Sequence, residues 1–275
     1  MAVWCGLLGL LALFTSRDMS GQSLVRAKGN YGVDSPGIVA TLCALAALGL
    51  LLGYFLSSVW KWFATVAGTY FLLGAVGMLF YSKVGKLALR ERLLDKIRWE
   101  GNEIVLDVGC GRGLLTVGAA HRLSTGKVVG VDVWQPGAIT GNRADAVLEN
   151  ARLEGVADRV EVRQGDARDL PFKGETFDVV VSNYVVHELK TRNERTQMMH
   201  EIARVLKPGG RVALVDFIFS GECVKELQST GVKAERRRDG FLSFWIAAVL
   251  NFGAVKTYHV VGQKTERSNL HSATG

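Results

Sequence analysis

Apolar side chains are distributed very unevenly along this chain of 275 residues. Residues 35–60 and 62–82 contain no charged side chain, and only Lys61 separates the two runs. Each run is long enough to cross the roughly 30 Å hydrocarbon core of a bilayer as a helix. Trp60 and Trp62 flank Lys61, as aromatic residues do at a membrane surface. The pattern predicts two transmembrane helices joined by a tight turn at 57–61.

The flanks and faces of these two runs add to that prediction. Small residues recur four apart at Gly49 and Gly53 and again at Ala64 and Gly68, a spacing that lets helices approach closely in lipid. The alternative is a hydrophobic core hairpin of a soluble protein. Basic side chains lie on both sides of the hairpin, which predicts that both flanks are cytoplasmic. They are Arg17, Arg26 and Lys28 before it, and Lys83, Lys86, Arg90, Arg92, Lys96 and Arg98 after it.

After the hairpin, short β-branched runs alternate with helical spacings of apolar residues. The predicted strands are 104–108, 128–133, 160–163, 177–182, 212–217, 232–236 and 257–261, with a turn at 207–210. The predicted helices are 87–99, 114–123, 141–154, 194–206 and 222–229. This alternation predicts an α/β fold with a doubly wound, mostly parallel seven-stranded sheet. Ligands of such sheets bind at the carboxyl ends of the strands.

The chain is therefore divided into four parts: 1–34, a partly apolar N-terminal segment; 35–82, the hairpin; 83–264, the α/β domain; and 265–275, a polar tail. The apolar residues 1–14 fit three interpretations, which stay open. They lie at the membrane surface, form a short third segment, or precede the true start, for which Met19 is an alternative.

Charge and cysteine usage exclude several classes of function. The net charge is +7, but the basic residues are scattered and not interleaved with aromatic ones, so no nucleic-acid partner is expected. The cysteines show neither a CxxC nor a Cys/His spacing, so no metal site and no disulfide framework is expected. They are Cys5, Cys43, Cys110 and Cys223.

Chemistry-bearing residues follow four of the predicted strands. The segment 107–113 is a Gly-rich loop that opens a helix, where free backbone N–H groups favour an anionic group. Alone, it fits a dinucleotide or a nucleoside equally. Asp132 ends the second strand and is placed to accept hydrogen bonds from ribose hydroxyls. Asp166, after the third strand, is placed to accept one from an adenine amino group, and Asn183 follows the fourth strand.

The order of these motifs resembles that of the class I S-adenosylmethionine-dependent methyltransferases, especially the group of small-molecule, quinone and arsenite methyltransferases. The similar segments are 105–113, 129–132, 165–167, 177–183 and 206–211, within roughly 83–264. The resemblance implies a Rossmann-like methyltransferase fold and S-adenosylmethionine as the cofactor. It implies that Asp132 binds the ribose, Asp166 the adenine amino group, and Asn183 the region of the sulfonium and the substrate. The methionine end would be held by Asp107, Gly109, Cys110, Gly111 and Gly113, and the adenine ring bordered by Val133 and Ala167.

The implied reaction is displacement at the cofactor's methyl carbon, for which the protein aligns the nucleophile and excludes water. A general base is needed only if the nucleophile arrives protonated. His187 is the best candidate for it, and Glu188 is a weaker one. A histidine packed at a helix start is the alternative for His187. With two cysteines in the soluble part, arsenite methylation is not expected.

Two further alternatives stay open for the function and one for the substrate. A nicotinamide-dependent oxidoreductase would need a G-x-G-x-x-G loop, which 109–114 does not match, and a non-catalytic cofactor-binding module would keep the same motifs.

The basic residues 236–238 precede an aromatic-rich apolar run, 240–250. That run is either a buried connector or a membrane-docking segment. Docking would favour a lipophilic acceptor over a water-soluble one for a membrane-anchored methyltransferase.

Overall fold

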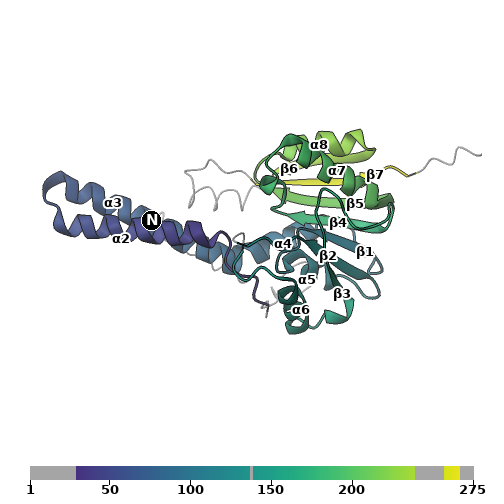
Figure 1. Ribbon diagram of the computed structural model, residues 1–275, viewed down its shortest axis with the longest axis horizontal. Helices are drawn as coiled ribbons and strands as arrows, with labels where there is room; N and C mark the ends of the chain where they lie inside the picture. Colours follow the sequence, from purple (N-terminus) through teal and green to yellow (C-terminus); the bar gives the residue numbers. More distant parts are fainter. Residues whose placement is uncertain (1–28, 137–138, 239–256, 267–275) are drawn as a thin grey trace, which may run out of the picture.

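A helical hairpin projects from an α/β domain in the computed structural model (Figure 1). The structure describes residues 29–136, 139–238 and 257–266. The predictions for 1–14, for Met19 as a start, for 240–250 as a docking segment and for most of the polar tail lie outside these residues.

The domain is built on a seven-stranded sheet of order β3-β2-β1-β4-β5-β7-β6. Strands β1 to β5 pair in parallel, and β7 is antiparallel to both β5 and β6. The strands are β1 Ile104–Val108, β2 Lys127–Asp132, β3 Val160–Gln164, β4 Phe177–Asn183, β5 Leu206–Asp216, β6 Val232–Arg238 and β7 Tyr258–Lys264. The predicted mostly parallel sheet is confirmed.

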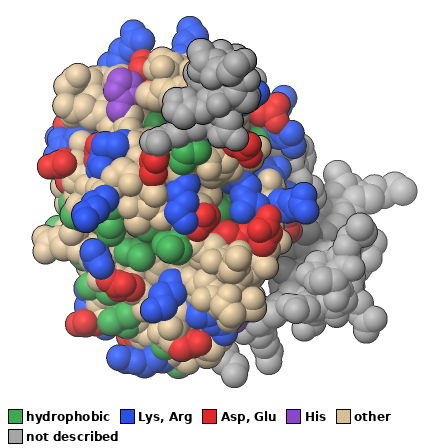
Figure 2. Space-filling view, turned by 90° about the vertical axis from the view of Figure 1, so that its right-hand side faces the viewer, with side chains coloured by type: hydrophobic (Ala, Val, Ile, Leu, Met, Phe, Trp, Pro, Cys, Tyr) green, Lys and Arg blue, Asp and Glu red, His purple; other side chains and the backbone are tan. Residues whose placement is uncertain are grey.

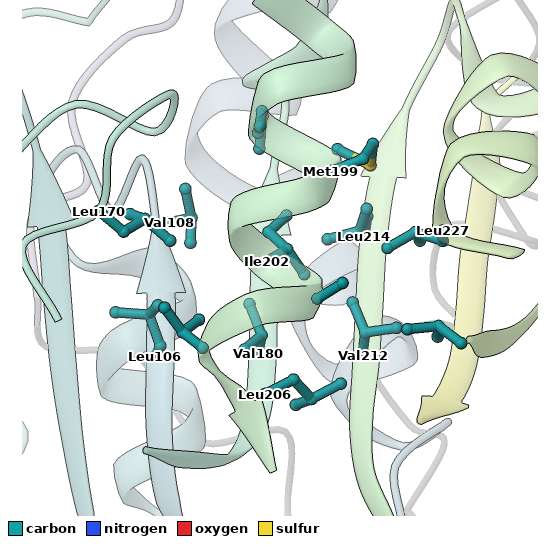
Figure 3. Close-up of a cluster of buried hydrophobic side chains, with 14 of the residues drawn as sticks. Leu106, Val108, Leu170, Val180, Met199, Ile202, Leu206, Val212, Leu214 and Leu227 are labelled. Atoms are coloured by element: carbon teal, nitrogen blue, oxygen red, sulfur yellow. The ribbon is translucent and has the colours of Figure 1, made fainter. Parts of the chain in front are cut away.

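Helices cover both faces of this sheet, and buried side chains alternate between the two faces along each strand. Leu106 and Val180 belong to a cluster beneath α7 and α8, which is shown in Figure 3, whereas Val105 and Val179 face α4 and α5. The helices of the domain are α4 Lys86–Leu94, α5 Leu114–Ala120, α6 Ala144–Leu153, α7 Arg192–Val205 and α8 Ser220–Ser229, with short 3-10 turns η2 Ala157–Arg159 and η3 Val186–Glu188.

Most element boundaries lie within three residues of the sequence-based expectation, and two differ from it by more. The predicted turn at 207–210 is wrong, because strand β5 begins at Leu206 and includes these residues as a bulge. Its partner β4 pairs Phe177 with Leu206 but Val179 with Arg211, so the extra residues of β5 leave the ladder there. Helix α4 ends at Leu94, before the predicted end at Trp99, and the Trp99 indole donates to the Leu94 carbonyl at 2.9 Å.

The hairpin consists of α2, Pro36–Phe55, and α3, Ser58–Phe80. The chain reverses at Leu56 and Ser57, so the turn is shorter than predicted and Lys61 lies inside α3. The predicted close approach at small residues is confirmed. A Cβ atom on Gly68 would lie 2.6 Å from the Leu50 nitrogen, and one on Gly53 would lie 2.3 Å from Thr65 Oγ1.

Helix α3 runs into the domain without a break. A π-helical turn, η1 Tyr81–Gly85, joins it to α4. On α4, Leu89, Leu93 and Leu94 are fully buried in the core beneath the sheet. The hairpin is therefore anchored in the domain by a continuous helix. Both helices are long and apolar enough to cross a membrane, by length and composition.

Candidate functional site

The Gly-rich loop turns tightly at the carboxyl end of β1. Gly109, Gly111 and Gly113 all have positive φ, at 72°, 54° and 82°. A Cβ atom on Gly109 would lie 2.1 Å from Val185 Cγ2, and one on Gly113 would lie 2.7 Å from Val147 Cγ1. Conformation and space both demand glycine here. The predicted loop is therefore formed as a backbone cradle at the N-terminus of α5.

Asp132 ends β2 and fastens the loop to the sheet. Its carboxylate accepts hydrogen bonds from the backbone N–H groups of Gly111 and Trp134, both at 2.7 Å. The Trp134 indole in turn donates to the Gly111 carbonyl at 3.0 Å. A carboxylate offers about four acceptor positions, so Asp132 retains capacity for ligand hydroxyls. Sequence reasoning missed Trp134, which reaches the loop through a left-handed backbone at φ 47°.

Asp107 and Cys110 are both buried beneath the cradle. Asp107 accepts a hydrogen bond from Thr116 Oγ1 at 2.6 Å, and burial raises its pKa to about 7. Burial and the nearby Asp107 carboxylate raise the pKa of the Cys110 thiol well above its usual range. Cys110 is therefore a protonated packing residue rather than a nucleophile.

A small cavity of about 50 Å³ lies at this edge of the sheet. The predicted residues Asp107, Gly109, Cys110, Gly111 and Asn183 line it. Tyr184, which follows Asn183 after the fourth strand as expected, also lines the cavity. Side chains that sequence reasoning did not connect with the site complete the lining, among them Tyr31, Asp34, Tyr81 and Lys86. An open groove of about 750 Å³ lies at the opposite end of the strands and contains none of the predicted site residues.

Asn183 offers an acceptor to a ligand. Its Oδ1 atom is buried and has no hydrogen-bond partner among the residues that the structure describes. An unpaired buried acceptor is costly, so a ligand that brings a donor would be stabilised there. Together with the glycine cradle, this atom fits the polar methionine end of S-adenosylmethionine.

The predicted adenine contacts lie at the margin of this arrangement. Asp166 stands on the turn after β3, where its carboxylate accepts from the Arg168 guanidinium at 2.6 Å and from the Arg168 backbone N–H at 2.8 Å. The Arg168 hydrogen bond lowers the pKa of Asp166. Ala167 packs against the core cluster, and Val133 is 42% exposed. None of the three lines the cavity.

His187 is oriented by a buried carboxylate. Its Nδ1 atom lies 3.2 Å from Asp216 Oδ2, and its Nε2 atom lies 3.2 Å from Glu188 Oε1. Burial opposes the charged imidazole, but the Asp216 and Glu188 carboxylates outweigh it and raise the pKa of His187. The Phe217 ring packs on it with centroids 4.5 Å apart. Sequence reasoning missed Asp216, although it ends β5, where the strand-end rule would have found it.

Known proteins resemble the chain in sequence and fold. Residues 106–214 match a family model described as a methyltransferase domain. A demethylmenaquinone methyltransferase of Lactiplantibacillus plantarum is 34% identical over 128 residues, which cover 46% of this chain and 50% of that protein. A protein of Encephalitozoon cuniculi that carries a methyltransferase name is 30% identical over 176 residues, covering 64% of this chain and 71% of that protein.

Solved structures share the fold. The geranyl diphosphate C-methyltransferase from Streptomyces coelicolor A3(2) superposes with a TM-score of 0.51 at 17% identity, over 65% of this chain and 77% of that one. At this identity the likeness concerns the fold alone. The matched region spans about half the length, or less, of most of the curated relatives.

Proposed function

The chain belongs to the class I S-adenosylmethionine-dependent methyltransferases, and we propose that it methylates a small lipophilic acceptor at the cytoplasmic face of a membrane. The main support for a cofactor site is that three features lie at one edge of the sheet: the glycine cradle, Asp132 and the unpaired Asn183 side-chain oxygen. The adenine roles of Asp166, Val133 and Ala167 stay a prediction.

In this proposal the chain's residues hold the cofactor and manage one proton. When bound, S-adenosylmethionine supplies a methyl group that its sulfonium already makes electrophilic. His187 Nε2 accepts the proton of an acceptor hydroxyl, while the Asp216 carboxylate at Nδ1 fixes the tautomer and the ring orientation. Glu188, 62% exposed at its side chain, swings away from Nε2 as the acceptor enters. The Asn183 carbonyl and the glycine cradle orient the polar end of the cofactor.

The dimensions of the hairpin support the membrane part of the proposal. Helices α2 and α3 have 20 and 23 residues, or about 30 and 35 Å at the usual rise per residue. This matches the roughly 30 Å of a hydrocarbon core. Aromatic side chains gather at its tip, with Tyr54 80%, Trp60 65% and Trp62 69% exposed. On the domain face that points away from the hairpin, acidic and basic side chains intermingle, as at a water-exposed surface (Figure 2).

The lipophilic acceptor is supported by the relatives and by the position of the site. Two of the similar proteins are named as quinone methyltransferases, one for demethylmenaquinone and one for 2-phytyl-1,4-beta-naphthoquinone. In this chain, Asn183 and Tyr184 share their cavity with Tyr81, the residue that directly follows the second apolar helix. An acceptor that resides in the membrane would therefore meet the site at the end of the hairpin.

Cofactor binding by the full chain in detergent or nanodiscs tests the site. We expect S-adenosylmethionine to bind in isothermal titration calorimetry, and the Asp132→Asn variant to bind roughly 10- to 100-fold more weakly, since hydrogen bonds to a charged group contribute about 1.5–3 kcal/mol. Asp145→Asn, at an exposed position on α6, is the matched control and should bind as the wild type does. Absence of binding by the wild type, or full affinity in Asp132→Asn, contradicts the assigned site.

A further inference from the structure

An extended segment crosses the cofactor cavity directly before α2. It comprises residues 29–34 and is called the strap below. Its backbone is fastened to the domain: Asn30 N donates to Asn150 Oδ1 at 2.7 Å and Val33 N donates to Thr140 Oγ1 at 2.9 Å. Arg112, the loop residue between Gly111 and Gly113, donates from Nε to the Asn30 carbonyl at 2.7 Å. The strap is thus tied to the cofactor loop itself.

Lys86 holds the strap from the other side. Only 4% of this residue is exposed, so its ammonium group needs partners to be tolerated. Its Nζ atom donates to the carbonyls of Tyr31 and Gly32 at 2.7 and 3.0 Å, and lies 3.3 Å from both carboxylate oxygens of Asp34. These contacts use the three hydrogens of the ammonium group. Lys86 therefore does not act as one of the exposed basic residues that flank the hairpin.

Ser82 completes this contact and fixes its place in the chain. Its Oγ atom accepts from the Asp34 backbone N–H at 3.0 Å and donates to Asp34 Oδ2 at 3.1 Å. Asp34 lies just before α2 begins at Pro36, and Ser82 lies just after α3 ends at Phe80. The three residues Asp34, Ser82 and Lys86, called the joint, thus connect the strap with the base of both hairpin helices.

The joint is also a wall of the cofactor cavity. Asp34 and Lys86 line it together with Tyr31, Tyr81 and residues of the Gly-rich loop. The enclosed volume of about 50 Å³ is small beside the roughly 300–1,000 Å³ of ordinary small-molecule sites. A cofactor seated on the loop therefore lies in direct contact with the strap and the joint, so the position of this wall affects cofactor binding.

We propose that the strap and the joint form the closing wall of the cofactor site, with Lys86 as the positioning residue that holds this wall against the base of the membrane hairpin. This inference rests on the proposed function for the identity of the ligand. It assigns cofactor affinity to residues outside the family motifs. It also couples cofactor binding to the position of the hairpin on the domain, because the contacts of Lys86, Asp34 and Ser82 serve both.

Cofactor affinity of the full chain in phosphatidylcholine–phosphatidylglycerol nanodiscs tests the proposal. In Lys86→Met the ammonium group is lost but the length of the side chain is kept. We expect a tenfold or greater loss of S-adenosylmethionine affinity, and faster hydrogen exchange at the amides of Asn30, Val33 and Asp34. Lys83→Met, one turn away on an exposed position, is the matched control and should change neither quantity. Lys86→Arg, which keeps donors for the same carbonyls, should recover part of the affinity.

The outcomes separate this proposal from the proposed function. Wild-type affinity in a folded Lys86→Met protein overturns the proposal while leaving the cofactor site intact, and so does faster exchange in the strap without loss of affinity. A wild type that fails to bind S-adenosylmethionine overturns the proposed function instead. If Lys86→Met does not fold, Asp34→Asn takes its place. This variant should lose three- to tenfold in affinity, and unchanged affinity in it also contradicts the proposal.

Discussion

At the scale of residues, Asp107 and Asp132 lie at the carboxyl ends of adjacent strands, as the last but one residue of β1 and the last residue of β2, yet have different surroundings. Asp132 accepts two backbone N–H groups at the edge of the site, whereas Asp107 is buried with one partner, Thr116. Burial without a cationic partner favours the protonated carboxyl group, so the folded protein holds a proton on Asp107 that the unfolded chain releases. Asp107 therefore makes the free energy of unfolding depend on pH.

This dependence predicts the behaviour of Asp107→Asn. The pKa of Asp107 rises from 3.8 to about 7 on folding, so its favourable contribution is complete below pH 4 and is lost as the pH rises through 7. The neutral amide keeps an acceptor for Thr116. We therefore expect the stability of the ligand-free variant relative to the wild type to increase by up to a few kcal/mol between pH 4 and pH 8. Thermal unfolding across this range measures the difference, and parallel curves for the two proteins would refute the assignment.

A second pH dependence belongs to His187. The neutral imidazole is the base, and the pKa of His187 is raised above 6.5, so methyl transfer should decline as the pH falls through that raised value. Asp216→Asn removes the main stabilising partner of the cation. We expect the acidic limb of the pH profile to move to lower pH, while the maximal rate falls roughly 100-fold.

Asp178→Asn is the control for this experiment, because Asp178 pairs with Lys207 at 2.8 Å at the other end of β4. It should leave the profile in place. An acidic limb that stays at the wild-type pH in Asp216→Asn would show that His187 does not carry the proton.

Much of the site was predictable from the sequence, and there is a physical reason why the remaining residues were not. Gly109 and Asp132 occupy positions that strand–loop–helix geometry dictates, and local spacing is enough to find them. Trp134 reaches the loop through one left-handed residue that no pattern marks. Asp166 has the expected place in the chain, but Arg168 holds its carboxylate in an ion pair that only the folded turn creates.

At the scale of elements, the sequence pattern located every described strand except β5 within three residues, because each contains a short run of apolar residues or of alternating apolar and polar ones. The exception, β5, starts early because its bulge at 207–210 remains part of the strand rather than a separate turn. A proline and two glycines predict a turn from local propensity, whereas the sheet absorbs them as a bulge opposite the first residues of β4. Tertiary pairing thus overrides the local signal.

The contact between α2 and α3 leads to a prediction about Gly68. The Cβ atom of Gly68→Ala would lie 2.6 Å from the Leu50 nitrogen, which forces the helices apart. Overpacking of this kind costs about 1–3 kcal/mol, so we expect a lower midpoint of thermal unfolding in nanodiscs. Gly37→Ala, where nothing lies within 4 Å of the new atom, is the matched control. Equal midpoints for the two variants would contradict the close packing of the hairpin.

At the scale of the whole molecule, the hairpin and the cofactor site share a boundary. The sequence separates residues 29–34 from the Gly-rich loop by more than 70 positions, and no periodic pattern marks them, so their return across the cavity could not be predicted. Local sequence patterns predicted the hairpin and the sheet, but only as separate parts. Their union depends on polar contacts such as Lys86 to Tyr31, which form only between distant segments.

The proposed orientation of this assembly predicts the accessibility of the hairpin tip. Ser57 lies exposed at the reversal between α2 and α3, so Ser57→Cys should react with a membrane-impermeant maleimide from outside intact cells. Lys190→Cys, at an exposed position of the domain, should react only after the cells are opened. Labelling of both sites from one side would contradict a hairpin that spans the membrane.

Methyl transfer to a lipophilic acceptor can be measured by following the methyl group of the cofactor into the membrane lipids. Membranes that carry the full chain are incubated with S-adenosylmethionine labelled in its methyl group, and the lipid extract is counted beside that of membranes carrying Asp132→Asn. We expect label in the lipid extract of the wild type and a loss of most of it in the variant. Cofactor binding without label in any extract would instead indicate a binding module, and label confined to the aqueous phase would contradict a lipophilic acceptor.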